Sequence, residues 1–519
     1  MPSNYSIDLG ALFCEIVATQ PSDTNVDWQA IAVTGIKEDS RNIAPGDLFV
    51  ARDGECFKGT DYIAKAVSNG AVAVLVNKST QFPCAIDLHS FTVPVIALQS
   101  LCDRVGEIAA RVFDNVACKL NIIGITGTNG KTSCAHYIAQ ALNSLKVKTF
   151  IIGTLGNGDP SALQEASRTT PDACALQQMF AEFYHAGAQT VVMEVSSHAL
   201  EQGRVNGGAF KGGAFTNLSR DHLDYHGTMQ AYGKAKGRLF TDYPVEHRVL
   251  NLDDAYNRQL LASLSVAQRD STVTFSESLN EKADAGAANC SLDNGLQFCV
   301  KHGQTNVDIK SQLLGKFNLA NLLLTYLVLE RLGYTQRQIQ SSLSLLQPVP
   351  GRMQNVVESP SQPLCIVDYA HTPDALEKAL QASRVHCSGK LTLVFGCGGD
   401  RDNGKRAEMA KVAQRFADSV IVTSDNPRTE EPLQIIDMIT AGFTKGAAYT
   451  VISDRKAAIV AAINCAVVGD LVLVAGKGHE DYQEIMGHKE YFLDAQVVAL
   501  ALTERDNQHS SAKTSGNKI

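Results

Sequence analysis

The sequence lacks the features that would place the protein in a membrane or on nucleic acid. No uninterrupted apolar run approaches the ~20 residues of a membrane-spanning helix, so we expect no membrane insertion. Residues 1–12 carry Asp8 and no basic stretch, which argues against a secretory signal. The net charge is -8, and lysine and arginine form no block that could line a nucleic-acid surface. These absences favour a globular protein that acts on small molecules.

The cysteines form no C-x-x-C pair, the spacing typical of zinc sites and redox motifs. There are 13 of them, an odd number, scattered from Cys14 to Cys465. In a chain of this length the pattern predicts reduced, mostly buried thiols in a cytoplasmic protein, without a disulfide framework or a zinc site. Cys397 lies in a glycine-rich turn and is the one candidate for a reactive thiol.

The chain of 519 residues is too long for one hydrophobic core, and its length predicts roughly three domains. Turn signals divide it into residues 1–98, 99–345 and 346–519, with a polar tail after about residue 504 that we expect to be disordered. Short apolar runs alternate with helical patterns, which predicts an α/β fold with parallel sheets and a doubly wound, Rossmann-like C-terminal domain. The predicted strands include 47–51, 71–76, 120–125, 149–152, 190–195, 215–218, 248–252, 364–367, 391–395, 420–423 and 471–475.

A glycine-rich turn in the second unit carries the most chemical content. The apolar run 120–125 precedes it, and a helical pattern begins at Lys131. This order of strand, turn and helix predicts a phosphate-binding loop for ATP or GTP. Gly127 and Gly130 allow the backbone to approach an anion, Lys131 is expected on the terminal phosphates, and the Thr132 hydroxyl is expected on Mg²⁺.

Polar side chains follow two further apolar runs of this unit. Glu194 ends one run, and His222 follows another within the segment 217–227. The carboxyl ends of parallel strands meet at one edge of a sheet, so both side chains are expected beside the phosphate loop. With Thr132 they would suffice for Mg²⁺, which takes few protein ligands. A zinc site with His198, a capping role for Glu194 and a structural role for His222 are the alternatives.

Four strand ends of the third unit bring polar groups to one edge, at 368–374, 396–406, 425–428 and 476–480. Arg401 and Arg428 are suited to clamp a carboxylate, because a guanidinium offers two parallel N–H donors. Separate surface salt bridges are the alternative for these arginines. The glycines at 396–399 do not complete G-x-G-x-x-G, which disfavours NAD binding.

Six motifs follow one another along the chain. They are G-T-N-G-K-T-S from Gly127, E-V-S-S-H from Glu194, D-H-L-D-Y-H from Asp221, P-G-R-M from Pro350, D-Y-A-H-T-P-D from Asp368 and G-K-G-H-E from Gly476. In these motifs the chain resembles the Mur ligases, ATP-dependent amide ligases of peptidoglycan precursor synthesis, over nearly its whole length apart from the tail. It is most similar to the members that add the third residue of the stem peptide.

The resemblance implies one domain each for the UDP-sugar, ATP and the incoming amino acid. It implies that ATP phosphorylates the D-glutamate carboxylate of UDP-N-acetylmuramoyl-L-alanyl-D-glutamate, and that the amine of meso-diaminopimelate attacks the acyl phosphate. We expect a cytoplasmic monomer that uses Mg²⁺ and these small molecules, without nucleic acid or membrane insertion.

The resemblance also implies site residues. Catalytic roles fall to Lys131, Lys236 and His222. ATP-binding residues are Gly127, Thr128, Asn129, Gly130, Lys131, Thr132, Ser133, Asn318, Arg352 and Asp368. UDP-sugar-binding residues are Ser40, Thr169, Thr170, Ser196, Gln202 and Arg204. Diaminopimelate-binding residues are Arg401, Asp425, Asn426, Pro427, Arg428, Gly476 and Glu480. Metal ligands are Thr132, Glu194, His222 and Lys236 as its carbamate.

Several departures and alternatives stay open at the level of sequence. A standard phosphate loop has glycine where Ile125 stands, and Arg168 replaces an asparagine common in the family. The loop 53–59 lacks the His-Gln-Ala form of some members, which leaves its uridine contacts undefined. Competing functions are an L-lysine-adding ligase of the same family, a folylpolyglutamate-type ligase and a P-loop ATPase or switch. L-lysine has no distal carboxylate and would leave Arg428 unpaired.

Overall fold

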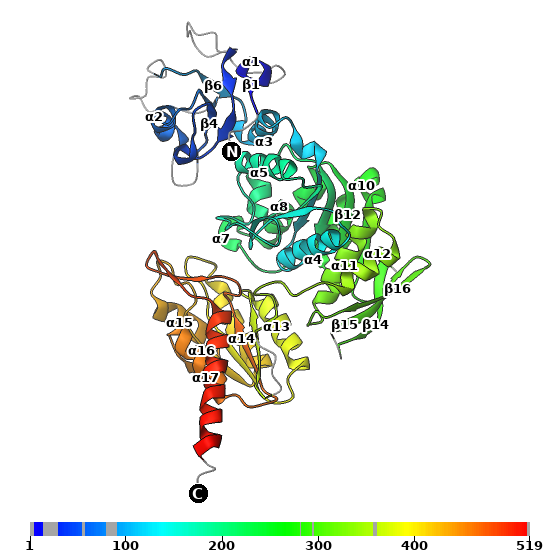
Figure 1. Cartoon of the computed structure of the whole chain (residues 1–519), viewed down its shortest axis with the longest axis vertical. Coiled ribbons are helices and arrows are strands. Elements are labelled where there is room, and N and C mark those ends of the chain that lie inside the picture. Colours follow the sequence, from blue (N-terminus) through cyan, green and yellow to red (C-terminus); the bar gives the residue numbers. More distant parts are fainter. Residues whose placement is uncertain are drawn as a thin grey trace.

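The computed structural model describes residues 5–13, 30–53, 58–78, 91–280, 282–292, 295–356 and 361–515. The chain forms three α/β domains in sequence order, which confirms the predicted fold class (Figure 1). Their main sheets have four, ten and six strands. Within the described residues, no helix is long and apolar enough to cross a membrane. The domain limits near residues 98 and 345 stay predictions.

The N-terminal domain contains the parallel sheet β3-β4-β5-β6. Strand β4 is buried at every position because apolar residues occupy both of its faces. Helix α3 packs against this sheet and also contacts α5 of the central domain. The elements are β1 (Ile7–Asp8), α1 (Leu9–Leu12), β2 (Ala32–Val33), β3 (Gly35–Lys37), β4 (Asp47–Ala51), α2 (Ile63–Ser68), β5 (Ala73–Asn77), β6 (Val95–Leu98) and α3 (Leu101–Val112).

The central sheet has the order β16-β15-β14-β13-β12-β11-β7-β10-β8-β9, with parallel pairing from β14 to β8. The strand predicted at 215–218 is wrong, because β11 ends at Phe215. Gly212 and Gly213 weaken its sequence signal, while pairing with β7 and β12 holds it in the sheet. The first elements are β7 (Asn121–Thr126), α4 (Lys131–Ser144), β8 (Thr149–Gly153), β9 (Gly156–Gly158), α5 (Ala173–His185), β10 (Thr190–Glu194), α6 (Ser197–Glu201) and β11 (Phe210–Phe215).

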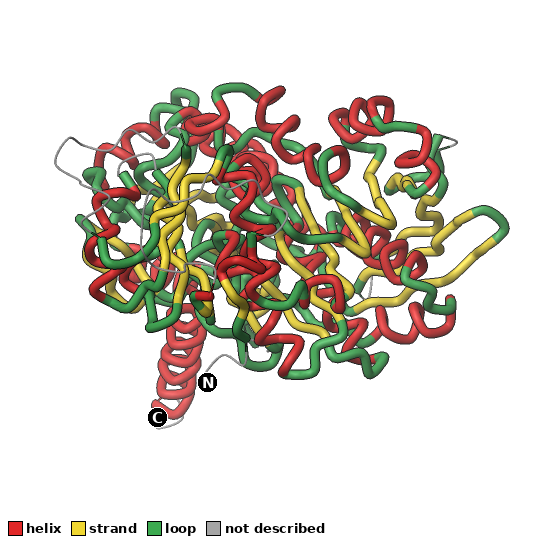
Figure 2. Tube along the Cα trace, turned by 90° about the horizontal axis from the view of Figure 1, so that it is seen from above, coloured by secondary structure: helices red, strands yellow, loops and turns green. Residues whose placement is uncertain are grey.

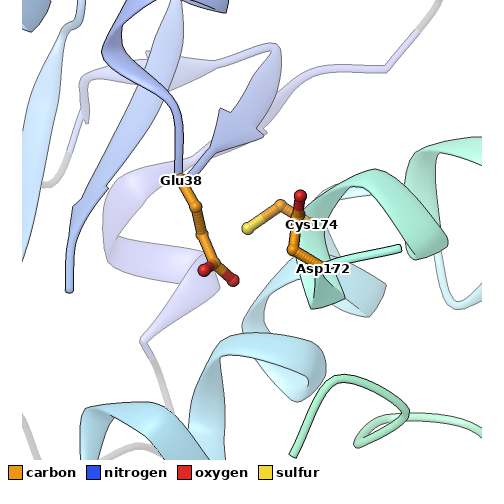
Figure 3. Close-up of side chains that lie close together, drawn as sticks. All are labelled: Glu38, Asp172 and Cys174. Carbon is orange, nitrogen blue, oxygen red and sulfur yellow. The ribbon is translucent and has the colours of Figure 1, made fainter. Parts of the chain in front are cut away.

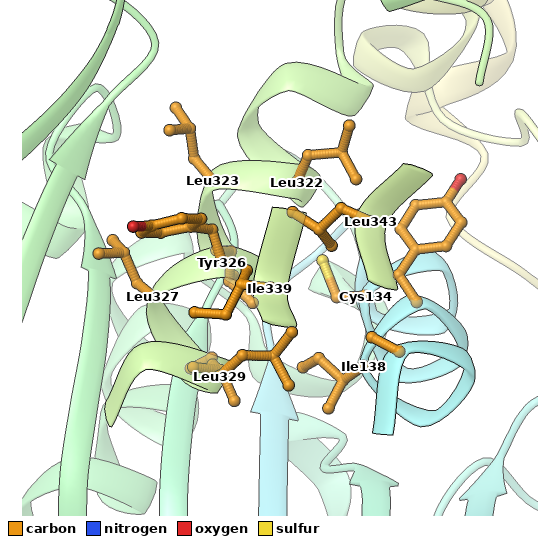
Figure 4. Packing of buried hydrophobic residues seen from close by; sticks show 14 of the residues in the cluster. Cys134, Ile138, Leu322, Leu323, Tyr326, Leu327, Leu329, Ile339 and Leu343 are labelled. Atoms are coloured by element: carbon orange, nitrogen blue, oxygen red, sulfur yellow. The ribbon is translucent and has the colours of Figure 1, made fainter. Parts of the chain in front are cut away.

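Helix α11 forms the core that holds α4 in place. It is buried along nearly its whole length, and its leucines pack with Ile138 of α4 and Ile339 of α12 (Figure 4). A helix that is apolar on most of its surface belongs inside a domain. The remaining elements are α7 (Leu223–His226), α8 (Met229–Thr241), β12 (Val245–Asn251), α9 (Ala255–Ser263), α10 (Val266–Asp270), β13 (Thr272–Ser276), β14 (Ala285–Ser291), β15 (Leu296–His302), β16 (Thr305–Ser311), α11 (Asn318–Arg331) and α12 (Gln336–Ser344).

The C-terminal domain has the sheet order β17-β18-β22-β19-β20-β21, parallel except for the short edge strand β17. Over much of the whole chain, helices lie beside the strands in the view from above (Figure 2). The hairpin β23–β24 was not expected from the sequence. The elements are β17 (Gln354–Asn355), β18 (Leu364–Asp368), α13 (Pro373–Val385), β19 (Leu391–Phe395), α14 (Gly404–Phe416), β20 (Ser419–Val422), α15 (Pro432–Thr440), β21 (Tyr449–Val451), α16 (Arg455–Cys465), β22 (Leu471–Ala475), β23 (Tyr482–Ile485), β24 (His488–Tyr491) and α17 (Asp494–Ser515).

The expectation of a disordered tail after residue 504 is wrong for its first part. Helix α17 continues to Ser515 and projects from the C-terminal domain (Figure 1). Its first turns are fixed because Val498 and Leu502 pack in a core shared with α16. No glycine or proline interrupts the segment, so the helix extends from this nucleus through polar residues.

A partly buried acidic contact joins the N-terminal and central domains. Glu38 faces Asp172 and Cys174 at the start of α5, and their donor atoms lie within 4.8 Å of one another (Figure 3). Arg52 lies 3.7 Å from one Glu38 oxygen, and the other oxygen is buried without a hydrogen bond. Burial first, and then the charge of Asp172, raise the pKa of Glu38 from 4.5 to about 7. A protonated Glu38 can therefore face Asp172 at neutral pH.

We predict that Glu38→Gln stabilises the ligand-free protein at high pH only. The ionised form of Glu38 is disfavoured in the fold, so wild-type stability falls as pH rises from 4.5 to about 7. The variant lacks this penalty, which is on the order of 3 kcal/mol for a pKa raised from 4.5 to about 7. Melting temperatures should agree near pH 4.5 and diverge by a few degrees at pH 8. The exposed Glu107→Gln is the control, and parallel pH profiles for wild type and Glu38→Gln would contradict the assignment.

Candidate active site

A cavity of about 1120 Å³ lies where the central and C-terminal domains meet. Its wall includes Lys131 and Glu194 from the central domain and Arg401 and Arg428 from the C-terminal domain. Both sets of residues lie at the carboxyl ends of parallel strands, where open α/β sheets bind ligands. The two edges predicted separately from the sequence therefore face a single space.

The phosphate loop links β7 to α4. Gly127 and Gly130 have φ values of 139° and 86°, a region that favours glycine. A side chain at Gly127 would meet the Thr216 hydroxyl at 1.9 Å, so the loop also needs glycine for space. Ile125 is fully buried within β7, which explains the missing glycine, because this position belongs to the strand. The phosphate loop therefore consists of the glycine turn after β7 and does not include Ile125.

Two lysine amines meet at the carbonyl oxygen of Gly127. Lys131 Nζ donates to it at 3.0 Å and to the Thr128 carbonyl at 2.9 Å, and Lys236 Nζ donates to Gly127 at 2.7 Å. Burial lowers the pKa of both amines, and the charge of Lys131 lowers that of Lys236 further. The pocket therefore favours an anion close to these two groups.

Glu194 is held at the end of β10 by three donors. The Thr132 hydroxyl donates to its carboxylate at 3.0 Å, and the backbone and hydroxyl of Thr154 donate at 2.8 and 3.1 Å. The carboxylate is buried but lines the cavity. Thr132 and Glu194, predicted as neighbours, are brought together.

His222 lies on the same wall, next to a carboxylate that was not among the predicted site residues. Its Nε2 is 3.4 Å from Asp221, which also approaches Nε2 of His371 at 3.8 Å and Nζ of Lys405 at 3.9 Å. Burial lowers the pKa of His222 to about 3, so its ring is neutral at pH 7. The His198 ring packs edge-on against the His222 ring, with 5.0 Å between the two ring centroids. His198 is therefore a packing neighbour of His222. The D-H pair was the sequence signal for Asp221.

Polar contacts at the cavity join the central domain to the C-terminal domain. Arg352 Nη2 donates to the Thr132 hydroxyl at 3.1 Å, and Asn129 Nδ2 donates to Asp374 at 2.9 Å. Asp374 lies in the first turn of α13. The phosphate loop thus touches the C-terminal domain directly.

The other predicted ATP-site residues differ in exposure to the cavity. Thr128, Asn129, Ser133 and Asp368 line it, and burial raises the pKa of Asp368. Asn318 is buried behind the wall, where its Oδ1 accepts from the Tyr137 hydroxyl at 3.2 Å and from the Asn321 amide at 3.0 Å. Asn321, which sequence reasoning did not select, lines the cavity in front of it.

The predicted UDP-sugar residues form one network in the central domain. Thr169 and Ser196 line the cavity. Arg204 lies behind them and donates from Nη1 to the Thr170 carbonyl at 3.0 Å and from Nε to Gln202 Oε1 at 2.9 Å. The Thr170 hydroxyl in turn donates to the Ser196 hydroxyl at 3.3 Å.

Ser40 is separate from this network along the chain. It begins a short 3₁₀ helix, Ser40–Asn42, in the N-terminal domain and does not line the cavity. Glu55, Cys56 and Phe57 lie outside the described residues. The predicted uridine contacts at 53–59 therefore stay a prediction.

The predicted amino-acid site is assembled from the ends of three strands, β19, β20 and β22. Arg401, Asp425, Arg428, Gly476 and Glu480 all line the cavity. Burial, and then the charge of Asp425, raise the pKa of Glu480.

Asn426 and Pro427 lie behind this wall. Asn426 is 1% exposed and donates from Nδ2 to Glu480 Oε2 at 2.7 Å. Arg428 has a φ of 53°, and its Nη1 donates to the Gly399 carbonyl at 2.8 Å. Cys397 is buried, and burial raises the pKa of its thiol to about 12, which argues against a reactive thiolate.

The sequence matches three domain families of one enzyme group. Residues 32–113 match the Mur ligase family catalytic domain, residues 125–329 the Mur ligase middle domain, and residues 351–478 the Mur ligase glutamate ligase domain. The matches cover all three sheets.

Similar proteins cover almost the whole chain. The UDP-N-acetylmuramoyl-L-alanyl-D-glutamate--2,6-diaminopimelate ligase of Coxiella burnetii is 46% identical, across 91% of this chain and 96% of that protein. The ligase of the same name from Chromobacterium violaceum is 45% identical, across 91% and 95%. A solved structure of a ligase with this name has a TM-score of 0.67 and 36% identity, covering 95% of this chain and 100% of its own. The Thermotoga maritima MurF ligase in complex with ADP shares the fold, with a TM-score of 0.62 and 18% identity, across 92% and 99%. The chain is a ligase and belongs to the Mur ligase family.

Proposed function

We propose that this ligase uses ATP to join meso-diaminopimelate to UDP-N-acetylmuramoyl-L-alanyl-D-glutamate in peptidoglycan precursor synthesis. The observation that carries the proposal is the single cavity with a phosphate loop on one wall and the Arg401 and Arg428 guanidinium groups on another. Relatives named for the same reaction are 46% and 45% identical over 91% of the chain.

The reaction has two steps. The D-glutamate carboxylate attacks the γ-phosphorus of ATP, which forms an acyl phosphate and releases ADP. The amine of diaminopimelate then attacks the acyl carbon, loses a proton and expels inorganic phosphate, so that an amide remains. A single cavity suits these two consecutive steps, because the acyl phosphate is hydrolysed if water reaches it before the amine does.

The phosphate loop acts on the first step. Lys131 now donates to two loop carbonyls, and it would exchange these for phosphate oxygens when ATP arrives. Backbone N–H groups at the start of α4 would orient the phosphates. We assign nucleotide contacts to Arg352 and Asp368 on the opposite wall, and a supporting role to the buried Asn318.

The donors beside the loop fit Mg²⁺. A hydroxyl from Thr132, a carboxylate from Glu194 and a neutral imidazole from His222 line one wall. The first two are hard oxygen donors, which Mg²⁺ prefers, and His222 would add one nitrogen donor. When bound, the ion would neutralise charge on the phosphates. Glu194 also accepts two bonds from Thr154, which fixes the carboxylate before a metal arrives.

We propose that Lys236 is carbamoylated and completes this ligand set. CO₂ adds only to a neutral amine, and burial lowers the pKa of Lys236 well below its ordinary value. The product is a carbamate anion within the same pocket as Lys131, whose ammonium would balance it. The modification would place the carbamate anion of Lys236 beside the ammonium of Lys131, where the unmodified chain has two amines.

The remaining substrates are assigned by position. Thr169, Thr170, Ser196, Gln202 and Arg204 would hold the sugar dipeptide, with Ser40 of the N-terminal domain on its uridine end. Residues 1–98, 99–345 and 346–519 would bind the UDP-sugar, ATP and the amino acid. We propose a cytoplasmic monomer, since ATP is a co-substrate and the central and C-terminal domains of a single chain are enough to form the cavity.

The amino-acid site selects for a second carboxylate. Arg428 and Arg401 would bind the distal carboxylate of diaminopimelate, and Asp425, Asn426, Pro427, Gly476 and Glu480 would shape the pocket. L-lysine would leave the arginines without an anion, which costs affinity in a buried site.

We expect phosphate release from ATP only when UDP-N-acetylmuramoyl-L-alanyl-D-glutamate and meso-diaminopimelate are both present. L-lysine and L-ornithine should give little release, because neither carries the distal carboxylate. A coupled phosphate assay with mass spectrometry of the amide product measures this. Release without the nucleotide substrate would instead favour an ATPase or switch, and faster release with L-lysine would favour the lysine-adding alternative.

Arg428→Ala should lower kcat/KM for diaminopimelate on the order of 100-fold, because a charge-assisted pair is lost. The KM for ATP should change less than about twofold, since the phosphate loop lies on the other wall. Exposed Arg415→Ala on α14 is the matched control. An equal loss for ATP and diaminopimelate would contradict the assignment of Arg428 to the amino acid.

A further inference from the structure

The hairpin β23–β24 lies against the loop 425–428 and has little packing of its own. None of its residues belongs to the buried apolar cores, and Ile485, Met486 and Tyr491 are exposed. An isolated two-stranded hairpin is marginally stable in water. Its order must therefore come from the polar contacts it makes with its surroundings.

Those contacts fall on the loop that carries Arg428. The Arg428 N–H donates to the Glu484 carbonyl at 3.0 Å, and the Met486 N–H donates to the Arg428 carbonyl at 2.6 Å. Arg428 thus pairs with β23 through both backbone groups, as a parallel bridge to Ile485. This pairing holds a non-glycine residue at a φ of 53°, a conformation that is unfavourable without support.

The same strand holds the start of the loop. Gln483 Nε2 donates to the Asp425 carbonyl at 2.7 Å, and the Glu484 N–H donates to Asn426 Oδ1 at 2.9 Å. Lys477, fully buried, donates to Asn426 Oδ1 at 3.2 Å and also to the Tyr482 carbonyl. These contacts act on the loop backbone and on the Asn426 amide, and the Glu484 carboxylate also lies 4.0 Å from Nε of the Arg428 guanidinium.

We infer that β23 is a splint for the amino-acid site, and that Gln483 is a positioning residue for Arg428. The inference rests on the proposed function for its kinetic consequence. A guanidinium binds a carboxylate with two N–H donors only when its orientation is fixed. Gln483 provides a side-chain hydrogen bond from β23 to the loop, so its loss should let the loop 425–428 move and weaken the binding of diaminopimelate. Gln483 itself does not line the cavity.

The test compares Gln483→Leu with Glu490→Ala. Glu490 lies directly opposite Gln483 in the hairpin and is exposed. Gln483→Leu keeps the size of the side chain and removes the amide donor. We expect KM for meso-diaminopimelate to rise about tenfold, the factor for one lost hydrogen bond. The kcat and the KM values for ATP and the sugar dipeptide should stay within about twofold, and Glu490→Ala should match wild type.

Hydrogen exchange on the ligand-free protein supplies a readout that needs no substrate. The peptide covering 425–428 should exchange faster in Gln483→Leu than in wild type or Glu490→Ala, with an unchanged melting temperature. If wild type does not use diaminopimelate, the proposed function fails, and exchange alone decides the splint. Unchanged exchange in Gln483→Leu, or an equal rise in all three KM values, would overturn the inference.

Discussion

Lys131 and Lys236 place two buried amines against the carbonyl oxygen of Gly127, at 3.0 and 2.7 Å. Water would screen such a pair at the surface, but burial lowers the pKa of both groups and makes a nearby anion the favourable solution. ATP phosphates would supply it for Lys131. We propose that a carbamate supplies it on Lys236 itself. The rest of the site fits around this requirement, since Glu194 and the neutral His222 ring stand on the same wall.

The fold fixes this pair through its most buried parts. Gly127 directly follows β7, a strand paired on both sides, and Lys131 begins α4, which packs on the apolar helix α11. Lys236 comes from α8, on which it is 1% exposed. The C-terminal domain reaches the loop through Arg352 on the Thr132 hydroxyl. The residues that we assign to the phosphates and to the amino acid therefore line one cavity although they lie far apart in the chain.

The sequence predicted what depends on local pattern. The phosphate loop followed from a strand, glycines and a helix start, and Glu194 and Arg428 followed from strand ends. What it missed depends on tertiary contacts. Asn321 looks ordinary in sequence and gains its place when α11 packs on α4, where the Cys134 thiol donates to it at 3.4 Å. Asp221 meets His371 and Lys405 only where the central and C-terminal domains come together. The hairpin β23–β24 has little apolar pattern and is ordered by hydrogen bonds to a loop 56 to 58 positions away. Helix α17 extends further than its polar composition predicted, because its first turns pack in the hydrophobic core.

The most direct measurement is carbon NMR of the ligand-free protein equilibrated with ¹³C-bicarbonate. If Lys236 carries a carbamate beside the Lys131 amine as proposed, the wild-type spectrum shows a carbamate resonance near neutral pH. This resonance disappears on acidification and is absent from Lys236→Arg. A guanidinium keeps the positive charge and forms no carbamate, so the variant isolates the modification from the charge. A wild-type spectrum without the resonance, or one unchanged in Lys236→Arg, would contradict the account.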